Sequence, residues 1–94
     1  MRRIAYIILL LSLLSNLIGQ QQSDPNQLVK SGNEKLKFQD YTGAIRDFNK
    51  ASRMNPSLNE AFIGRADAKY NLSQYDEALR DINKSIEINR VRLD

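Results

Sequence analysis

An internal repeat constrains this chain more than any other feature. When residues 41–55 are compared with the residues 34 positions later, 7 of the 15 pairs are identical. The identical pairs are Tyr41 and Tyr75, Ala44 and Ala78, Arg46 and Arg80, Asp47 and Asp81, Asn49 and Asn83, Lys50 and Lys84, and Asn55 and Asn89. Phe48 is matched by Ile82 at the same offset, so apolar character is kept where identity is lost. Identity at one fixed offset indicates two structurally equivalent units.

Apolar residues in both units recur at helical spacing. They predict four helices, over 25–38, 44–54, 58–70 and 75–88. In the first unit the apolar faces contain Leu28, Val29, Leu36 and Phe38, and then Ala44, Ile45, Phe48, Ala51 and Met54. In the second unit they contain Ala61, Phe62, Ala66 and Tyr70, which face inward, and then Tyr75, Ala78, Leu79, Ile82, Ile86 and Ile88. No stretch alternates convincingly between apolar and polar residues, so no strand is expected. The predicted fold class is all-α.

Local signals place the ends of these helices. Asp24-Pro25, with Gln27 three positions after Asp24, predicts a capping box and a helix start. Ser57-Leu58-Asn59-Glu60 predicts a second capping box. The residues 40–43 and 73–74 read as turns, and Asn55-Pro56 ends a helix because proline disfavours helical geometry in the residue before it.

A 34-residue period with two helices in each unit resembles the tetratricopeptide repeat (TPR). In the first unit, Gly32, the pair Ala44 and Phe48, and Pro56 match the family pattern. In the second unit the matching positions hold Ala66, Ala78 with Ile82, and Phe62 in the place of the family's Trp. The resemblance implies two helix-turn-helix hairpins in a short α-solenoid, with repeat 1 at 25–58, repeat 2 at 59–92 and a tail at 93–94.

The first helix of each unit departs from the family pattern. Ser31 and Lys35 replace an expected Leu and Tyr, and Arg65 and Lys69 replace them in the second unit. We expect this loss of apolar residues to weaken the grip of each first helix on its partner. Arg90 also replaces the closing Pro of the second unit.

The resemblance implies a protein or peptide partner, bound on the concave surface that the first helices form. By the family's register, the predicted groove residues are Asn26, Val29, Asn33, Leu36, Lys37, Glu60, Ile63, Asp67, Tyr70 and Asn71. Some family members grip a chaperone C-terminus with a carboxylate clamp. Asn33 matches that clamp, but Val29 and Gly64 stand where polar or basic groups are needed, so no clamp activity is expected.

The segment 1–19 is predicted to form an apolar leader helix. Arg2 and Arg3 precede a stretch from Ile4 to Ile18 that is apolar except at Ser12, Ser15 and Asn16 and carries no charge. This arrangement is typical of a secretory signal peptide, with cleavage expected after Gly19 and a polar spacer at 20–24. The chain is then exported to the periplasm, cell envelope or medium. The alternative is a retained signal anchor, which would make the protein a membrane-anchored structural or assembly piece.

The composition argues against several classes of function. The chain has 14 Lys and Arg, so 12 remain after Arg2 and Arg3, against 11 Asp and Glu. A nearly neutral body argues against nucleic-acid binding, which needs a basic surface. The absence of Cys and His removes the usual zinc, haem and iron–sulfur ligands and the common nucleophile–base pairs. We therefore expect no enzyme activity, no cofactor and no metal. Asp76, Glu77 and Asp81 are interpreted as helix capping and as surface pairing with Arg80 and Lys84.

Two repeats are fewer than the three that such arrays usually need. Leu79, Ile86, Val91 and Leu93 are expected to form an uncovered apolar strip on the last helix. The exported domain is therefore predicted not to be a stable monomer. Three outcomes stay open: self-association, docking to a partner, or a chain that is the N-terminal part of a longer TPR protein.

Overall fold

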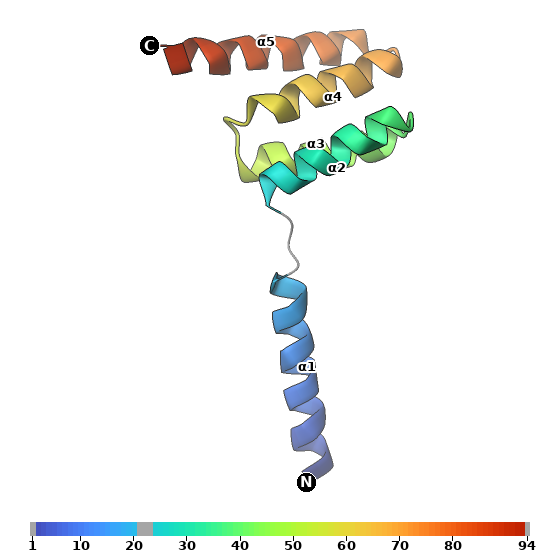
Figure 1. The fold of residues 1–94 in the computed structure, drawn as a ribbon, viewed down its shortest axis with the longest axis vertical. Helices are drawn as coiled ribbons and strands as arrows, with labels where there is room; N and C mark the ends of the chain where they lie inside the picture. The colour runs from blue at the N-terminus through green and yellow to red at the C-terminus, as the bar shows by residue number, and fades with distance from the viewer. Residues whose placement is uncertain (1, 21–23, 94) are drawn as a thin grey trace.

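The computed structural model describes the backbone of residues 2–20 and 24–93, with side chains at 2–14 and 24–93. Five helices are formed: α1 (Arg2–Gln20), α2 (Pro25–Lys37), α3 (Tyr41–Met54), α4 (Asn59–Asn71) and α5 (Tyr75–Leu93) (Figure 1). The described residues include no strand, and the all-α prediction is confirmed. Most of the predicted spacer, residues 21–23, and Asp94 at the end of the predicted tail lie outside the described residues.

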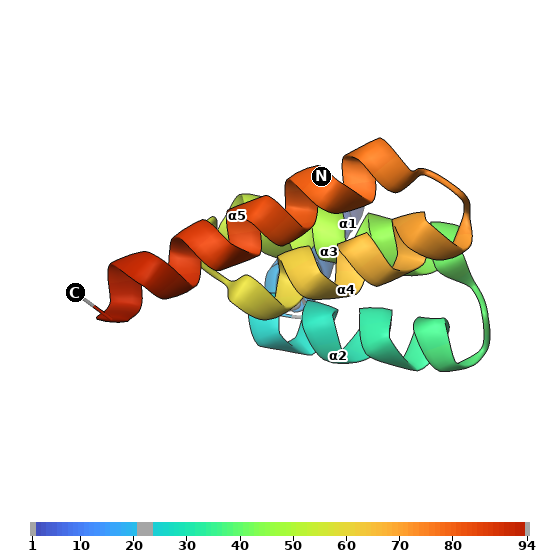
Figure 2. The same cartoon turned by 90° about the horizontal axis from the view of Figure 1, so that it is seen from above.

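Helices α2 to α5 form two stacked hairpins. α2 packs on α3, α4 packs on α5, and α4 also contacts both helices of the first hairpin. Seen from above, α4 lies between α2 and α5 (Figure 2). The second hairpin therefore lies on the first as a second layer of a helical repeat.

The turns of the two hairpins share their backbone conformation and two backbone hydrogen bonds. Gln39 and Ser73, which are separated by one sequence period, both have φ of 61°. The amide of each donates to the carbonyl three residues earlier, at 3.0 Å for Gln39 and 2.9 Å for Ser73. The next amide, of Asp40 or Gln74, donates to the carbonyl five residues earlier at 2.8 Å in both turns. The period of the sequence is thus also a period of the structure.

Helix starts agree with the sequence in α2 and differ in α3 and α4. The predicted capping box at Asp24 and Gln27 is confirmed, with the Gln27 amide donating to Asp24 Oδ1 at 2.9 Å. The turn predicted at 40–43 is wrong, because Asp40 is the N-cap of α3 and accepts from the Gly43 amide at 3.0 Å. The turn itself occupies residues 38–39, and Asp40 separates it from α3.

The second predicted capping box is also wrong. The N-cap of α4 is Leu58, which makes no side-chain hydrogen bond. Leu58 is instead buried in the core, and the amide of Ser57 donates to Asn55 Oδ1 at 3.1 Å. Hydrophobic burial fixes this helix start, so the hydroxyl of Ser57 is not needed as a cap.

The central core cluster lies between the hairpins and consists of the Phe48 ring, Leu58 and four alanines. Phe48 is 0% exposed, and Ala44, Ala51, Ala61 and Ala68 around it are also fully buried. A Cβ atom on Gly32 of α2 would lie 2.7 Å from the Phe48 ring, and one on Gly64 of α4 would lie 2.3 Å from it. Only glycine at these two positions lets both helices approach the ring.

Besides the strip on α5, five residues predicted to be on the apolar faces are exposed: Phe38, Met54, Tyr70, Tyr75 and Ile82. Phe38 is the C-cap of α2 and Met54 is the last residue of α3, so both stand at helix ends beyond the packed layer. Tyr70 lies on the part of α4 that no further described helix covers. The strip predicted on α5 is exposed, as expected, at Leu79, Ile86, Val91 and Leu93.

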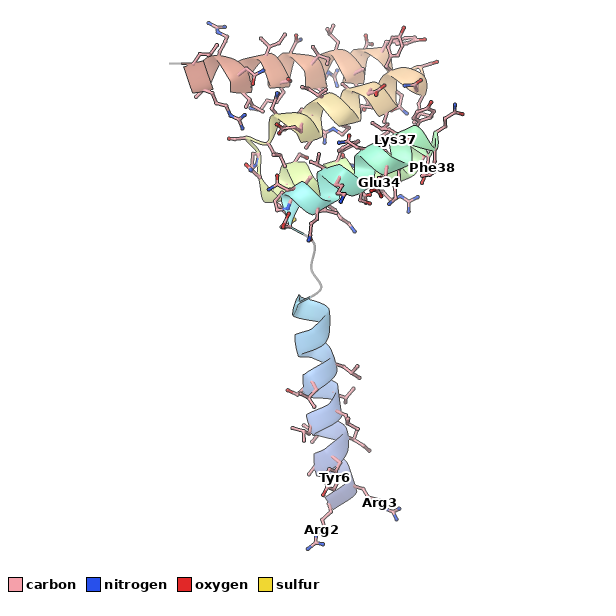
Figure 3. The ribbon with its side chains drawn as sticks, viewed as in Figure 1. Arg2, Arg3, Tyr6, Glu34, Lys37 and Phe38 are labelled. Carbon is pink, nitrogen blue, oxygen red and sulfur yellow. The ribbon has the colours of Figure 1, made fainter. Side chains whose placement is uncertain are left out.

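Helix α1 packs against none of the other described helices. Its described apolar side chains, from Ile4 to Leu14, are exposed, and Arg2, Arg3 and Tyr6 gather at its N-terminal end (Figure 3). No described helix combines the length and the apolar character that crossing a bilayer requires. Cleavage after Gly19 stays a prediction.

Candidate functional site

Each hairpin is held by a buried carboxylate. In the first hairpin, Asp47 Oδ2 of α3 accepts from Ser31 Oγ at 2.7 Å and from Lys35 Nζ at 2.8 Å, both on α2. Burial alone would raise the pKa of Asp47. The hydrogen bonds from Lys35 and Ser31, together with the positive charges of Lys35 and Lys50, outweigh burial and hold that pKa below its usual value.

The second hairpin repeats this arrangement one period later. Asp81 of α5 receives two bonds from Arg65, Nε at 2.9 Å and Nη2 at 2.7 Å, and pairs with Lys69 Nζ at 3.1 Å. The expected surface pairing of Asp81 with Arg80 and Lys84 is therefore wrong. Ser31, Lys35, Arg65 and Lys69 all pair with these carboxylates, so polar pairing takes the place of apolar packing at these positions. The expected weakening of the first helices stays a prediction.

Helices α4 and α5, which the Asp81 contacts join, line an open cleft of about 560 Å³. Its lining residues are Ile63, Ala66, Asp67, Tyr70, Tyr75, Ala78, Leu79 and Ile82. We call this the α4–α5 cleft. At one end the rings of Tyr70 and Tyr75 meet edge to face, with centroids 5.3 Å apart and planes at 62°.

The α4–α5 cleft is apolar, with few polar groups. Asp67 supplies a carboxylate and the two tyrosines supply hydroxyl groups. The described residues include no group of three or more acidic side chains that could hold a metal ion. Apolar contact with a few orienting hydrogen bonds is typical of a surface that binds a ligand.

The predicted groove residues are divided by the structure. Ile63, Asp67 and Tyr70 come together in the α4–α5 cleft. Val29 and Leu36 are partly buried and pack against the core. The remaining five are exposed on α2 and α4, outside this cleft: Asn26, Asn33, Lys37, Glu60 and Asn71.

The repeat explains why the cleft is open. Moved back by one period, its lining residues become Val29, Gly32, Asn33, Leu36, Tyr41, Ala44, Ile45 and Phe48. In the first hairpin most of this set is core or packs on the core, because α4 lies over it. Phe48 is 0% exposed there, whereas Ile82 at the equivalent position is 39% exposed. The α4–α5 cleft is the same interhelical surface without its covering helix.

Sequence reasoning missed the contribution of α5 to this site. The apolar spacing predicts Tyr75, Ala78, Leu79 and Ile82 for the packed face or the apolar strip, and it places none of them in a groove. These four residues stand 34 positions after Tyr41, Ala44, Ile45 and Phe48, which lie in or against the core of the first hairpin. Positions that face the next layer in the first repeat also face outward toward a next layer in the second repeat.

Comparison with known proteins gives a distant relative. The chain matches no family model, and no solved structure matches it. It is 28% identical over 80 residues to a protein of Arabidopsis thaliana described as a DnaJ protein P58IPK homolog. The match covers 85% of this chain and 17% of that protein, so the chain spans about a sixth of its relative.

Proposed function

We propose that this chain is a TPR-type protein-interaction module that catalyses no reaction. One observation carries the proposal: the α4–α5 cleft repeats, one period on, an interhelical surface that elsewhere in the same molecule is covered by a helix. Exposed apolar surface of this shape is stabilised when another protein segment covers it. Glu60 and Asn71, the other predicted groove residues of α4, are exposed and could add polar contacts to a bound partner.

Export is part of this proposal. The leader pattern supports a signal peptide, which would deliver the helical repeat to the periplasm, the cell envelope or the medium. A retained leader would instead make the protein a membrane-anchored assembly piece. Sequencing the N-terminus of the mature protein decides between them: Gln20, free or cyclised, supports cleavage, and an intact Met1 supports the anchor.

Affinity capture from the native cell extract tests the binding role. We expect Tyr70→Ala and Ile63→Asp to lose the partners that the unmodified chain retains, because both residues line the cleft. Phe38→Ala is the matched control, since Phe38 is also an exposed ring but lies outside the cleft. Retention of the same partners by both cleft variants would show that this surface is not used.

A second copy is the other candidate occupant of the apolar surface. Sedimentation equilibrium at low micromolar concentration measures this directly. A compact, cooperatively folding monomer would contradict the prediction that the domain is not stable alone. Association that Leu79→Glu abolishes would place the contact between copies at the α4–α5 cleft.

A further inference from the structure

The molecule contains an occupied copy of its own open cleft. On the first hairpin, α4 covers the surface equivalent to the α4–α5 cleft, and it does so with small residues. Ala61 and Ala68 of α4 are fully buried against that surface, and Gly64 lies between them against Phe48. These three residues are spaced i, i+3 and i+7, which puts them on one face of the helix.

The polar contacts of α4 add a second requirement. Arg65, at i+4 of the same series, donates from Nη1 to Asn49 Oδ1 on α3 at 2.9 Å. The residue equivalent to Asn49 on α5 is Asn83, which is exposed. Asn83 can therefore accept a hydrogen bond from a basic residue on a helix in the cleft, as Asn49 does from Arg65.

From these contacts we infer that the segment bound in the α4–α5 cleft is an α-helix of another protein with Ala or Gly at i, i+3 and i+7 and Arg or Lys at i+4. The inference rests on the proposed function and specifies the partner's surface. It is supported by the repeat, because the cleft residues stand one period after the residues that α4 covers in the first hairpin. Because Ile82 replaces the Phe48 ring in the cleft, Ala is accommodated at i+3 as well as Gly.

A head-to-tail second copy does not meet this requirement. It would place α2 in the cleft, where the residues equivalent to Ala61, Gly64 and Ala68 are Gln27, Lys30 and Glu34. These are polar and exposed on α2. Burying Lys30 and Glu34 against Leu79 and Ile82 would remove two charges from water without a partner on the apolar wall, which costs free energy. The exposed face of α2 therefore does not fit the α4–α5 cleft, and copies of this chain are not expected to stack head to tail.

Two synthetic peptides test the inference on the full chain in mild detergent. The first has the sequence of residues 58–72, which contains α4, and the second has that of residues 24–38, which contains α2. Fluorescence anisotropy should show the first peptide binding at least about tenfold more tightly than the second. Gly64→Leu in the first peptide, or Leu79→Glu in the protein, should weaken binding by about tenfold or more. Val91→Glu, which changes an exposed residue of α5 outside the cleft, should leave binding unchanged.

Disulfide trapping places the bound peptide, because the chain has no cysteine of its own. A peptide with Arg65→Cys should form a disulfide with Asn83→Cys in the protein. It should not react with Asn49→Cys, whose surface is already covered by α4. Trapping at Asn49→Cys would show that the peptide displaces α4, and the inference would then be wrong.

The outcomes separate this inference from the proposed function. Equal binding of the two peptides, or binding unaffected by Leu79→Glu, would overturn the inference that the partner is a helix with small residues on one face. If capture from the extract still depends on Tyr70 and Ile63 in that case, the cleft binds a partner of another form. If neither the peptide nor the captured partner depends on the cleft, both the inference and the proposed function fail.

Discussion

Asp47 and Asp81 show how two equivalent residues serve one role with different partners. Lys35 beside Asp47 is 40% exposed, so water solvates much of that ammonium group. Arg65 and Lys69 beside Asp81 are 16% and 15% exposed, so the carboxylate is their main counter-charge. Removing a buried partner is costly because the remaining charge stays away from water. The two carboxylates should therefore differ in their contribution to stability.

We expect Asp81→Ala to destabilise the fold by about 3 kcal/mol or more, because it leaves two largely buried cations unpaired. Asp47→Ala should cost about 1 kcal/mol, since Lys35 can turn to solvent. Urea denaturation followed by circular dichroism measures both. Where Asp81→Ala abolishes the cooperative transition, Asp81→Asn gives a measurable intermediate loss. Equal losses for the two alanine variants would contradict the difference in burial.

The lowered pKa of Asp47 predicts a pH dependence with a definite sign. The unfolded chain binds a proton at Asp47 more readily than the folded chain, so this residue stabilises the fold above its ordinary pKa of about 3.8. The contribution is lost as the pH falls through the lower, folded-state value. Unfolding free energies of the native chain and Asp47→Asn should therefore converge as the pH drops below about 4.

Urea denaturation of both chains at pH 6 and at pH 3 measures this convergence. A gap between Asp47→Asn and the native chain that stays constant over this range would show that the Lys35 and Ser31 contacts do not favour the ionised carboxylate.

At the scale of the helices, the Phe48 ring fixes how closely α2 and α4 approach. Gly32 and Gly64 face this ring from two helices, and it is fully buried. The ring cannot move away from one glycine without moving toward other packed atoms. Close-packed interiors respond to an added methyl group with strain because few voids are available.

Gly64→Ala should therefore destabilise the protein, although alanine is favoured over glycine in a helix by about 1 kcal/mol. The added Cβ would lie 2.3 Å from Phe48 Cζ, and relieving such overpacking costs about 1–3 kcal/mol. Thermal or urea unfolding measures the net change. Combining Gly64→Ala with Phe48→Leu should cost less than the sum of the two single changes, whereas strict additivity would show that the contact is not strained.

The sequence predicted the elements that depend on local and periodic signals. The four body helices, the Asp24 capping box and the Ser73 turn follow from residue type and spacing alone. The buried role of Asp81 could not be read in this way, because an acidic residue near Arg80 and Lys84 has the same local pattern whether it faces water or α4. Three-dimensional contact with Arg65, on the neighbouring helix, decides the difference.

The candidate site was predicted only in part for a similar reason. Ile63, Asp67 and Tyr70 were assigned from family register, and the structure places them in one cleft. Tyr70 is also expected to face inward. Leu36, the equivalent residue of the first repeat, packs against the core, whereas Tyr70 is exposed because no described helix covers it. Whether a repeat position is buried depends on the next layer, and that information is not contained in the repeat itself.

The body of the molecule is a stack of layers, so its stability should vary along the stack. In such arrays each layer gains stability from contact with its neighbours. The α3–α4 interface has neighbours on both sides and contains the fully buried residues Phe48, Ala51, Ala61 and Ala68. Helix α5 has a neighbour on one side, and Val91 and Leu93 at its end are 71% and 87% exposed. The lowest-energy openings should therefore begin at α5.

Native-state hydrogen exchange tests this order. The slowest amides should lie in α3 and α4, and within the repeat the fastest helical amides should lie in α5 after Ile86, since local opening there breaks few buried contacts. A helix bound in the α4–α5 cleft would give α5 a second neighbour. Adding the peptide of sequence 58–72 should therefore slow exchange in α5 around Leu79 and Ile82 more than in α2. Uniform protection from α2 to α5 would mean that the two hairpins open as one unit. If the peptide slowed exchange in α2 as much as in α5, it would not be bound at the α4–α5 cleft.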